Sequence, residues 1–282
     1  MSYKIGFIGL GLIGGSIAKA FRKYYPDCEI TVYNRSENSR IAALNDGVAN
    51  TITGEVDSNF SNCDYIFLCT PVEQNITYLT TLKEIIKDSC IITDVGSVKS
   101  NIHECITSLG MTSNFIGGHP MAGSEKTSYF NSSADIIKDS YYVLTPCKDT
   151  DESKLKELTE IVGNLKSIPV VLDYKQHDFI VAGISHVPHL IASNLVNMIE
   201  DSDDTDKHMK QLAAGGFKDI TRIASSSAEM WSQICSVNKD NIASIIDTYI
   251  EYLEKTKEAV INNDSDYIKE LFVKSKAYRD SI

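Results

Sequence analysis

Residues Lys4–Phe21, KIGFIGLGLIGGSIAKAF, predict the architecture of the N-terminal part of the chain. A short apolar run leads into a Gly-x-Gly-x-x-Gly pattern, and apolar residues at helical spacing follow it. Glycines at this spacing permit a tight turn, let the backbone approach a pyrophosphate and let the helix pack on the strand. The N–H groups at the start of that helix then face the anion. The predicted cofactor contacts of this turn are Gly9, Gly11, Leu12, Ile13 and Gly14.

The pattern extends to about residue 172. Short apolar runs alternate with longer amphipathic ones, which is typical of a parallel sheet with helices on both faces. Strands are predicted at Lys4–Ile8, Glu29–Tyr33, Asp64–Cys69, Cys90–Asp94, Asn114–Ile116, Tyr141–Thr145 and Ile168–Val171. Helices are predicted at Ile13–Tyr24, Arg40–Asp46, Gln74–Ile86, Lys99–Leu109 and Glu152–Asn164. The fold class is therefore α/β, with residues 1–172 forming a Rossmann-like, doubly wound domain that binds a dinucleotide.

Beyond Leu172 the strand signals end and helical patterns take over. Apolar residues from Ile242 to Leu253 recur with a period of 3.6, and a final helix is predicted at Tyr267–Tyr278. Residues 173–282 are therefore expected to form an all-helical domain. Because its apolar stripes need a partner surface, we expect a homodimer through the C-terminal helices.

Composition narrows the class of protein. The net charge of −11 and the lack of basic runs argue against a nucleic-acid partner. The seven cysteines form no CxxC pair, which is typical of reduced thiols. No window of about 18 unbroken apolar residues and no signal segment is found, so a cytoplasmic protein without a membrane partner is expected.

The second predicted strand leads into NRS, and these residues bear on the choice of cofactor. An NAD-selective site usually carries Asp or Glu about 20 residues after the glycines. Here that place holds Asn34, followed by Arg35 and Ser36, so no carboxylate repels a 2′-phosphate and Arg35 could bind one. We expect NADP or NAD, with NADP favoured. Thr70 and Pro71 are also expected to contact the cofactor.

Four further segments carry polar residues suited to chemistry. TDVGSVKS (93–100) and FIGGHPMAGSEK (115–126) each follow a predicted strand, so Ser97 and His119 are expected at the carboxyl edge of the sheet. GISHVPHLIASN (183–194) opens the helical domain, and GGFKDITRIA (215–224) follows later. The cations expected to attract an anionic substrate are Lys99, Lys126, Lys218 and Arg222. The glycines beside His119 are expected to press against cofactor and substrate, while Pro120 restricts the histidine's backbone.

In this order the blocks GLGLIGGS, DVGSVK, GGHPMAGSEK, SHVPH, GGFKDITRIA and MW resemble those of bacterial prephenate and arogenate dehydrogenases, over nearly the whole chain. The resemblance implies oxidative decarboxylation of prephenate to 4-hydroxyphenylpyruvate, with hydride transfer to NAD(P)⁺, in tyrosine biosynthesis. It implies that His119 takes the proton of the ring hydroxyl and that Ser97 bonds the same hydroxyl. The substrate-binding residues that it implies are Arg222, for a carboxylate, with Lys218, Ser185, His189, Ser124 and Trp231.

The side chains fit this chemistry without the resemblance. An imidazole, with an ordinary pKa of about 6.5, suits proton removal near neutral pH. The sequence lacks the spacing of metal ligands, and no metal is expected. His186 is expected to be structural, and His103, His177 and His208 to be surface residues. Glu125 and Asp219 are expected to hold Arg222.

Alternatives remain. Arogenate differs from prephenate only in an amino group, and no residue decides between them. A β-hydroxyacid dehydrogenase or an imine reductase has a similar layout, but it uses a lysine on the interdomain helix, where this chain has a serine and two histidines. A redox sensor would not need Ser97, His119 and Arg222 together. Some relatives carry an additional C-terminal regulatory domain, and none is expected here after Ile282.

Overall fold

The computed structural model describes residues 2–123 and 126–282. The chain forms two compact units, Met1–Val181 and Ala182–Ile282. The sequence places the boundary near Leu172. Helix α6 (Tyr174–Val181) lies between that point and the second unit, and its contacts assign it to the first.

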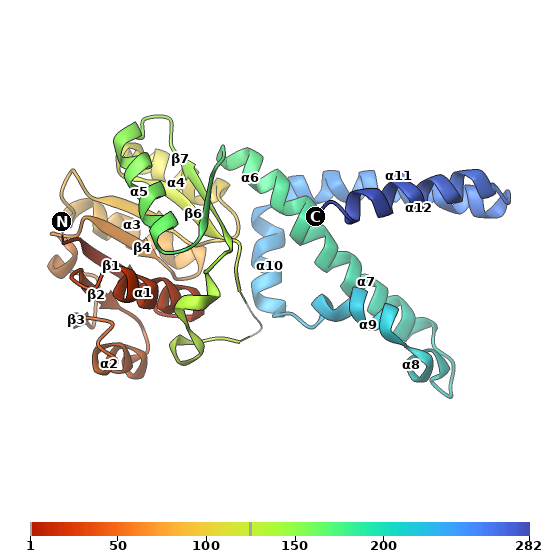
Figure 1. Ribbon diagram of the computed structural model, residues 1–282, viewed down its shortest axis with the longest axis horizontal. Coiled ribbons are helices and arrows are strands. Elements are labelled where there is room, and N and C mark those ends of the chain that lie inside the picture. The colour runs from red at the N-terminus through yellow and green to blue at the C-terminus, as the bar shows by residue number, and fades with distance from the viewer. Residues whose placement is uncertain (1, 124–125) are drawn as a thin grey trace. The chain divides into compact units, whose positions relative to one another are not determined.

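A parallel sheet of five strands forms the centre of the first unit (Figure 1). Its strands are β1 (Lys4–Ile8), β2 (Glu29–Tyr33), β3 (Thr51–Thr53), β4 (Tyr65–Leu68) and β5 (Ile91–Asp94). They lie in the order β3-β2-β1-β4-β5. Strands β2 and β3 are therefore added on one side of β1, and β4 and β5 on the other, with β1 and β4 as parallel neighbours. In open sheets of this kind, ligands bind at the carboxyl ends of the strands where the side of addition switches, here β1 and β4. The predicted doubly wound α/β fold is confirmed.

Helices cover both faces of the sheet. One apolar core joins the sheet to α1 (Leu12–Tyr24), α2 (Glu37–Asn45) and α5 (Glu152–Asn164), and a second joins it to α3 (Val72–Ile85) and α4 (Ser100–Leu109). Alternate residues of a strand point to opposite faces, so Phe7 packs in the first core and Ile8 in the second. Short 3₁₀ turns lie at Ser58–Phe60, Thr112–Asn114, Tyr129–Asn131 and Ala134–Ile136.

A second sheet departs from the prediction of one parallel sheet. It has the order β6-β7-β8, from β6 (Ile116–Pro120), β7 (Tyr141–Pro146) and β8 (Ile168–Val171), and β6 pairs with β7 in the antiparallel direction. The prediction ended this strand at Ile116, but the strand continues through His119, which pairs with Val143. Gly117 and Gly118 have low intrinsic strand preference, and their packing against neighbouring residues overrides it.

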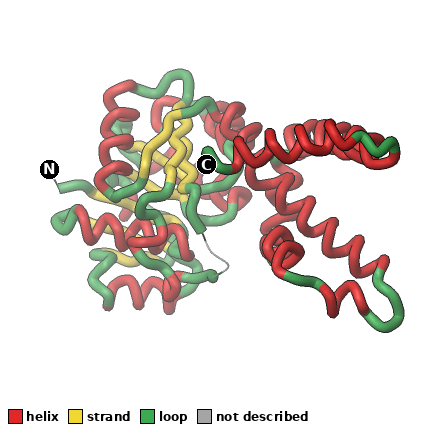
Figure 2. Tube along the Cα trace, turned by 45° about the vertical axis from the view of Figure 1, so that its right-hand side comes forward, coloured by secondary structure: helices red, strands yellow, loops and turns green. Residues whose placement is uncertain are grey.

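The described residues of the second unit form helices joined by loops, without a strand (Figure 2). The unit begins with a π-helical turn, Ala182–His186, and continues with α7 (Val187–Ser202), α8 (His208–Leu212), α9 (Gly215–Thr221), a 3₁₀ turn at Arg222–Ala224, α10 (Ala228–Val237), α11 (Lys239–Ile261) and α12 (Ser265–Arg279). Pro188 has no N–H to donate to the carbonyl of Ile184, so the regular hydrogen-bond ladder is interrupted at the π turn. The core of this unit is small and centres on Ala182, Val187 and Ile242.

Candidate active site

The glycine turn between β1 and α1 is packed on one side and open on the other. Gly9 has φ +97°, which favours glycine. A Cβ on Gly14 would lie 2.5 Å from the carbonyl oxygen of Gly9, so this glycine lets helix and strand touch. A Cβ on Gly11 would meet no heavy atom within 4 Å. The open side of the turn is therefore at Gly11, where a pyrophosphate would approach the N-terminus of α1.

The end of β2 closes this turn from the side. Asn34 accepts a hydrogen bond from the N–H of Leu10 through Oδ1 at 2.9 Å, and Arg40 donates to the carbonyl oxygen of Asn34. Arg35 is exposed, whereas Ser36 caps α2 by accepting from the N–H of Ser39. Asn34 therefore ties β2 to the glycine turn, and Arg35 is the cation beside it that solvent or a ligand can reach.

Thr70 and Pro71 follow β4 at the same edge of the sheet. The Thr70 hydroxyl donates to Asn75 Oδ1 at 2.5 Å. The amide nitrogen Nδ2 of Asn75 is buried and has no hydrogen-bond partner among the described residues. A buried amide without a partner is costly, so this group suits a ligand acceptor. No pattern in the sequence singles out Asn75. The glycine turn and Asn75 together fit a dinucleotide.

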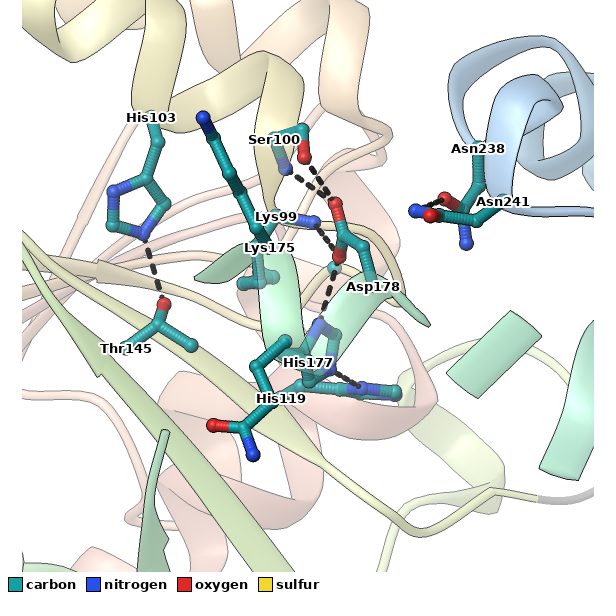
Figure 3. Close-up of polar contacts among 12 residues, drawn as sticks. Lys99, Ser100, His103, His119, Thr145, Lys175, His177, Asp178, Asn238 and Asn241 are labelled. Carbon is teal, nitrogen blue, oxygen red and sulfur yellow. Dashed lines mark hydrogen bonds and ion pairs between the residues drawn. The ribbon is translucent and has the colours of Figure 1, made fainter. Parts of the chain in front are cut away.

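His119 forms a hydrogen-bonded relay with His177 and Asp178 (Figure 3). His119 Nδ1 lies 2.8 Å from His177 Nε2, and His177 Nδ1 lies 2.8 Å from Asp178 Oδ1. His119 comes from β6, whereas its two partners come from the first turns of α6. The two rings meet edge to face, with centroids 5.1 Å apart.

The carboxylate of Asp178 is held ionised at the end of this relay. Burial opposes its ionisation, but hydrogen bonds from His177, from the Ser100 hydroxyl and from the N–H groups of Lys99 and Ser100 outweigh burial and lower the pKa of Asp178. The two N–H groups belong to the start of α4, where an anion is favoured.

An ionised Asp178 determines which nitrogen of each ring carries the proton. A carboxylate only accepts, so Nδ1 of His177 carries the proton that bonds Asp178. With one proton on the ring, Nε2 of His177 then accepts. His119 must then donate from Nδ1, which makes its Nε2 the nitrogen that can take a proton. This is the arrangement that a general base needs.

Two of the histidines expected on the surface are buried. His103 and His177 are 3% and 1% exposed, so the prediction for them was wrong, whereas His208 is exposed. His103 bonds the Thr145 hydroxyl at 2.9 Å and stacks on Tyr174, and burial with the nearby Lys99 charge lowers the pKa of His103 to about 4. Polar neighbours in sequence misled the prediction for His177, because in KQHD the first two residues are exposed whereas His177 and Asp178 are buried.

The segments around His119 also correct two expectations. Lys99 was expected as a cation for the substrate, but it is fully buried and paired with Asp94. The glycines were expected to press on ligands, but a Cβ at Gly117 would lie 2.3 Å from Thr145 Oγ1, and one at Gly118 would lie 2.5 Å from the Asp94 carbonyl oxygen. They allow close packing within the protein itself. Ser97 is half-buried in the loop after β5.

The second unit contains a compact aromatic cluster. The rings of His189 and Trp231 stack with centroids 4.1 Å apart, and His186 meets the same indole edge to face. His189 Nδ1 donates to the Ser185 carbonyl oxygen, and Asn238 donates to the buried His186, which fits the structural role expected for His186. Trp231 Nε1 is buried without a hydrogen-bond partner among the described residues.

The remaining predicted site residues are exposed or lie outside the described residues. Lys218 and Arg222 are exposed, at the end of α9 and just after it. Among the described residues, no ion pair joins Arg222 to Asp219. Ser124 and Glu125 lie outside the described residues. That the residues of the two units face one pocket stays a prediction.

Family models match both parts of the chain. The nucleotide-binding domain of prephenate dehydrogenase matches residues 17–170, and the dimerization domain of prephenate dehydrogenase matches residues 173–274. The chain belongs to the prephenate dehydrogenase family. A prephenate dehydrogenase of Bacillus subtilis is 36% identical over 276 residues, covering 97% of this chain and 74% of its own.

Solved structures of the prephenate dehydrogenase family have the same fold. The prephenate dehydrogenase of Aquifex aeolicus, in complex with hydroxyphenyl propionate and NAD⁺, superposes with a TM-score of 0.92 at 28% identity, over 99% of this chain and 98% of that one. The arogenate dehydrogenase of Synechocystis superposes with a TM-score of 0.90 at 28% identity, over 99% of both chains. A nicotinamide cofactor and an oxidoreductase activity follow from these matches.

Proposed function

We propose that the chain oxidises and decarboxylates prephenate to 4-hydroxyphenylpyruvate, with His119 as the general base. The relay His119–His177–Asp178 carries this proposal, because a proton on Nδ1 of His119 directs Nε2 of the same ring toward accepting the substrate's proton. The family membership supplies the substrate, and the relay supplies the residue that acts on it.

The reaction follows from the chemistry of a ring alcohol. Hydride leaves the ring carbon for the nicotinamide when the cofactor is bound. The hydroxyl proton passes to His119 Nε2, and a positive charge on this ring is stabilised through His177 by the Asp178 carboxylate. Loss of the ring carboxylate as carbon dioxide leaves its bonding electron pair in the ring, which becomes aromatic, and the ring oxygen takes back the proton held by His119. The protein therefore needs only to bind, orient and hold one proton.

The other residues are proposed to bind the substrate. Ser97 hydrogen-bonds the reacting hydroxyl, and Arg222, assisted by Lys218, binds a carboxylate. The unpartnered indole N–H of Trp231 supports a role as donor to a ligand oxygen, since a bound oxygen would satisfy it. The remaining proposed pocket residues are Ser124, Ser185 and His189.

The proposed cofactor is NADP, with NAD as the alternative. Asn34 stands where NAD-selective sites carry a carboxylate, and its side chain is engaged with the N–H of Leu10. The exposed Arg35 beside it suits a 2′-phosphate. Against this preference stands the Aquifex aeolicus relative, whose structure contains NAD⁺.

A crossed assay tests substrate and cofactor together. Initial rates of NAD(P)H formation are measured for prephenate and for arogenate, each with NAD⁺ and with NADP⁺. The proposal expects the highest rate with prephenate and NADP⁺. A highest rate with arogenate would support the alternative suggested by the similarity to the Synechocystis arogenate dehydrogenase. No turnover in all four combinations would contradict the proposed function.

Replacement of the base tests the role of His119. His119→Asn should lower kcat by about 10²- to 10⁴-fold, the range for loss of a general base. The dissociation constant for the cofactor, measured by calorimetry, should change little, because the glycine turn is untouched. Turnover close to that of the wild type would refute the assignment.

We also propose that the protein is cytoplasmic and works as a homodimer. The family's C-terminal domain is described as a dimerization domain, and large apolar side chains of α11 and α12 are exposed in the single chain. One helical stretch, Tyr174–Ser202, is long and apolar enough to cross a membrane by length and composition. Its first two turns contain the buried, hydrogen-bonded His177 and Asp178, and ionisable residues of this kind are unfavourable in lipid.

A further inference from the structure

A buried ion pair lies beside the strand that carries His119. Lys99 Nζ pairs with Asp94 Oδ2, and both side chains are fully buried. The same ammonium donates to the carbonyl oxygen of Gly118 at 2.8 Å, and Asp94 Oδ1 accepts from the N–H of Gly118 at 3.1 Å. The pair therefore holds both polar backbone groups of the residue that precedes His119.

The backbone of Lys99 also reaches the histidine relay. Its N–H donates to Asp178 Oδ1 at 2.8 Å, and the same oxygen bonds His177 Nδ1 at 2.8 Å. His119 is thus fixed in two ways: its backbone through Gly118 and its imidazole through His177. Both connections lead back to Lys99.

Stability alone does not account for this pair. Removing two charges from water costs about as much as their attraction returns, and apolar replacements of buried pairs are often neutral or stabilising. The pair is also too deeply buried to attract a substrate carboxylate. Its contacts with Gly118 are what an apolar pair could not make, because a backbone N–H and C=O need an acceptor and a donor.

We propose that Asp94 and Lys99 are positioning residues, which hold the backbone at Gly118 so that the His119 imidazole stays aligned with His177 and with the reacting hydroxyl. The proposal rests on the proposed role of His119 as the base. An error of about 1 Å in the placement of a reacting group can lower the rate by about 100-fold.

The test replaces Lys99 with methionine, which keeps most of the length of the side chain and removes its charge. Lys99→Met should lower kcat by about 10- to 100-fold and leave KM for prephenate within about threefold. In spectra of ¹⁵N-labelled histidine side chains, the His119 ring nitrogens should shift toward a mixture of the two neutral tautomers, because a displaced imidazole bonds His177 less well through Nδ1.

A matched control separates positioning from loss of stability. Ile106, fully buried on α4, belongs to the apolar core away from the relay. Ile106→Ala should lower the thermal midpoint but leave kcat and the His119 signals unchanged. If Lys99→Met has the same kcat and the same histidine spectrum as Ile106→Ala, the proposal is wrong.

The double variant Asp94→Asn/Lys99→Met covers the case in which the single variant does not fold. With both charges removed, no unpaired charge stays buried, so folding should recover. The proposal expects kcat to stay low in this folded variant because Gly118 has lost its donor, and full recovery of kcat would overturn it. If His119→Asn retains turnover while Lys99→Met still changes the histidine spectrum, the role of His119 as base has failed and the positioning has not.

Discussion

Asp178 sets the direction of two hydrogen bonds in the proposed site. Asp178→Asn should lower kcat by about 10²- to 10⁴-fold, because an amide can donate to His177 and so reverse the protonated nitrogens of both rings. Steady-state kinetics check the rate. The fully folded state of the variant is checked by near-ultraviolet circular dichroism. A variant with unchanged kcat would show that the relay does not orient the base.

The same variant should also change how the stability of the protein depends on pH in acid. Hydrogen bonds lower the pKa of Asp178 in the folded protein, so its contribution to stability is present above the ordinary pKa of about 3.9 and disappears as the pH falls through the lower, folded value. Denaturation by urea at a series of pH values should therefore show a smaller loss of stability below about pH 4 for Asp178→Asn than for the wild type.

At the scale of residues, the sequence predicts the catalytic candidate His119 more readily than it predicts the residues that hydrogen-bond it. His119 stands between two glycines and a proline, and this unusual setting singles it out as a candidate functional residue. His177 and Asp178 sit in a polar run, KQHD, that reads as solvent-exposed, and only the fold shows that α6 turns these two side chains inward. Lys99 was predicted from its charge to meet a substrate, because burial of a lysine cannot be read from a local pattern.

At the scale of elements, two substitutions in the glycine turn should separate cofactor binding from stability. Gly11→Ala adds a Cβ that meets nothing within 4 Å, so the thermal midpoint should stay within a few degrees of the wild type, while the methyl group obstructs the approach of a pyrophosphate. Gly14→Ala places a Cβ 2.5 Å from a backbone oxygen, so it should lower the thermal midpoint markedly.

Calorimetric titration with the cofactor and a thermal melt of each variant check this pair. Gly11→Ala should bind the cofactor at least 10-fold more weakly although it is fully folded. Normal binding by this variant would mean that the pyrophosphate does not approach the turn at Gly11.

Strands with a clear run of apolar residues were predicted well, whereas strands that depend on pairing with a distant strand were not. The strands Lys4–Ile8, Glu29–Tyr33 and Ile168–Val171 have the predicted bounds. Strand β3 is only three residues long and was missed. Strand β6 was cut short because two glycines argue against a strand, and its direction depends on long-range pairing with β7, which local periodicity does not contain.

At the scale of the whole molecule, the second unit has more apolar surface than it can bury alone. Leu253 on α11 and Phe272 on α12 are 50% and 68% exposed, and no residue of α12 is buried. Phe272→Glu should therefore weaken the proposed homodimer, because a charge in an apolar interface loses its hydration. Light scattering coupled to gel filtration should show a lower mass than for the wild type at the same concentration.

A matched substitution completes that experiment. Lys274→Glu changes charge on the same helix at a polar position, and it should leave the mass unchanged. If Phe272→Glu elutes with the wild-type mass, α12 does not contribute to the interface.

The tight enclosure of Gly118 has a consequence for the spacing of β5 and β6. A side chain here would meet the Asp94 carbonyl oxygen at 2.5 Å and the Thr93 hydroxyl at 2.8 Å, so even a single methyl group has no room. A larger residue could occupy this position only if β5 and β6 lay farther apart than they do here. The spacing of these two strands, and with it the place of His119 at the end of β6, therefore depends on the absence of a side chain at Gly118.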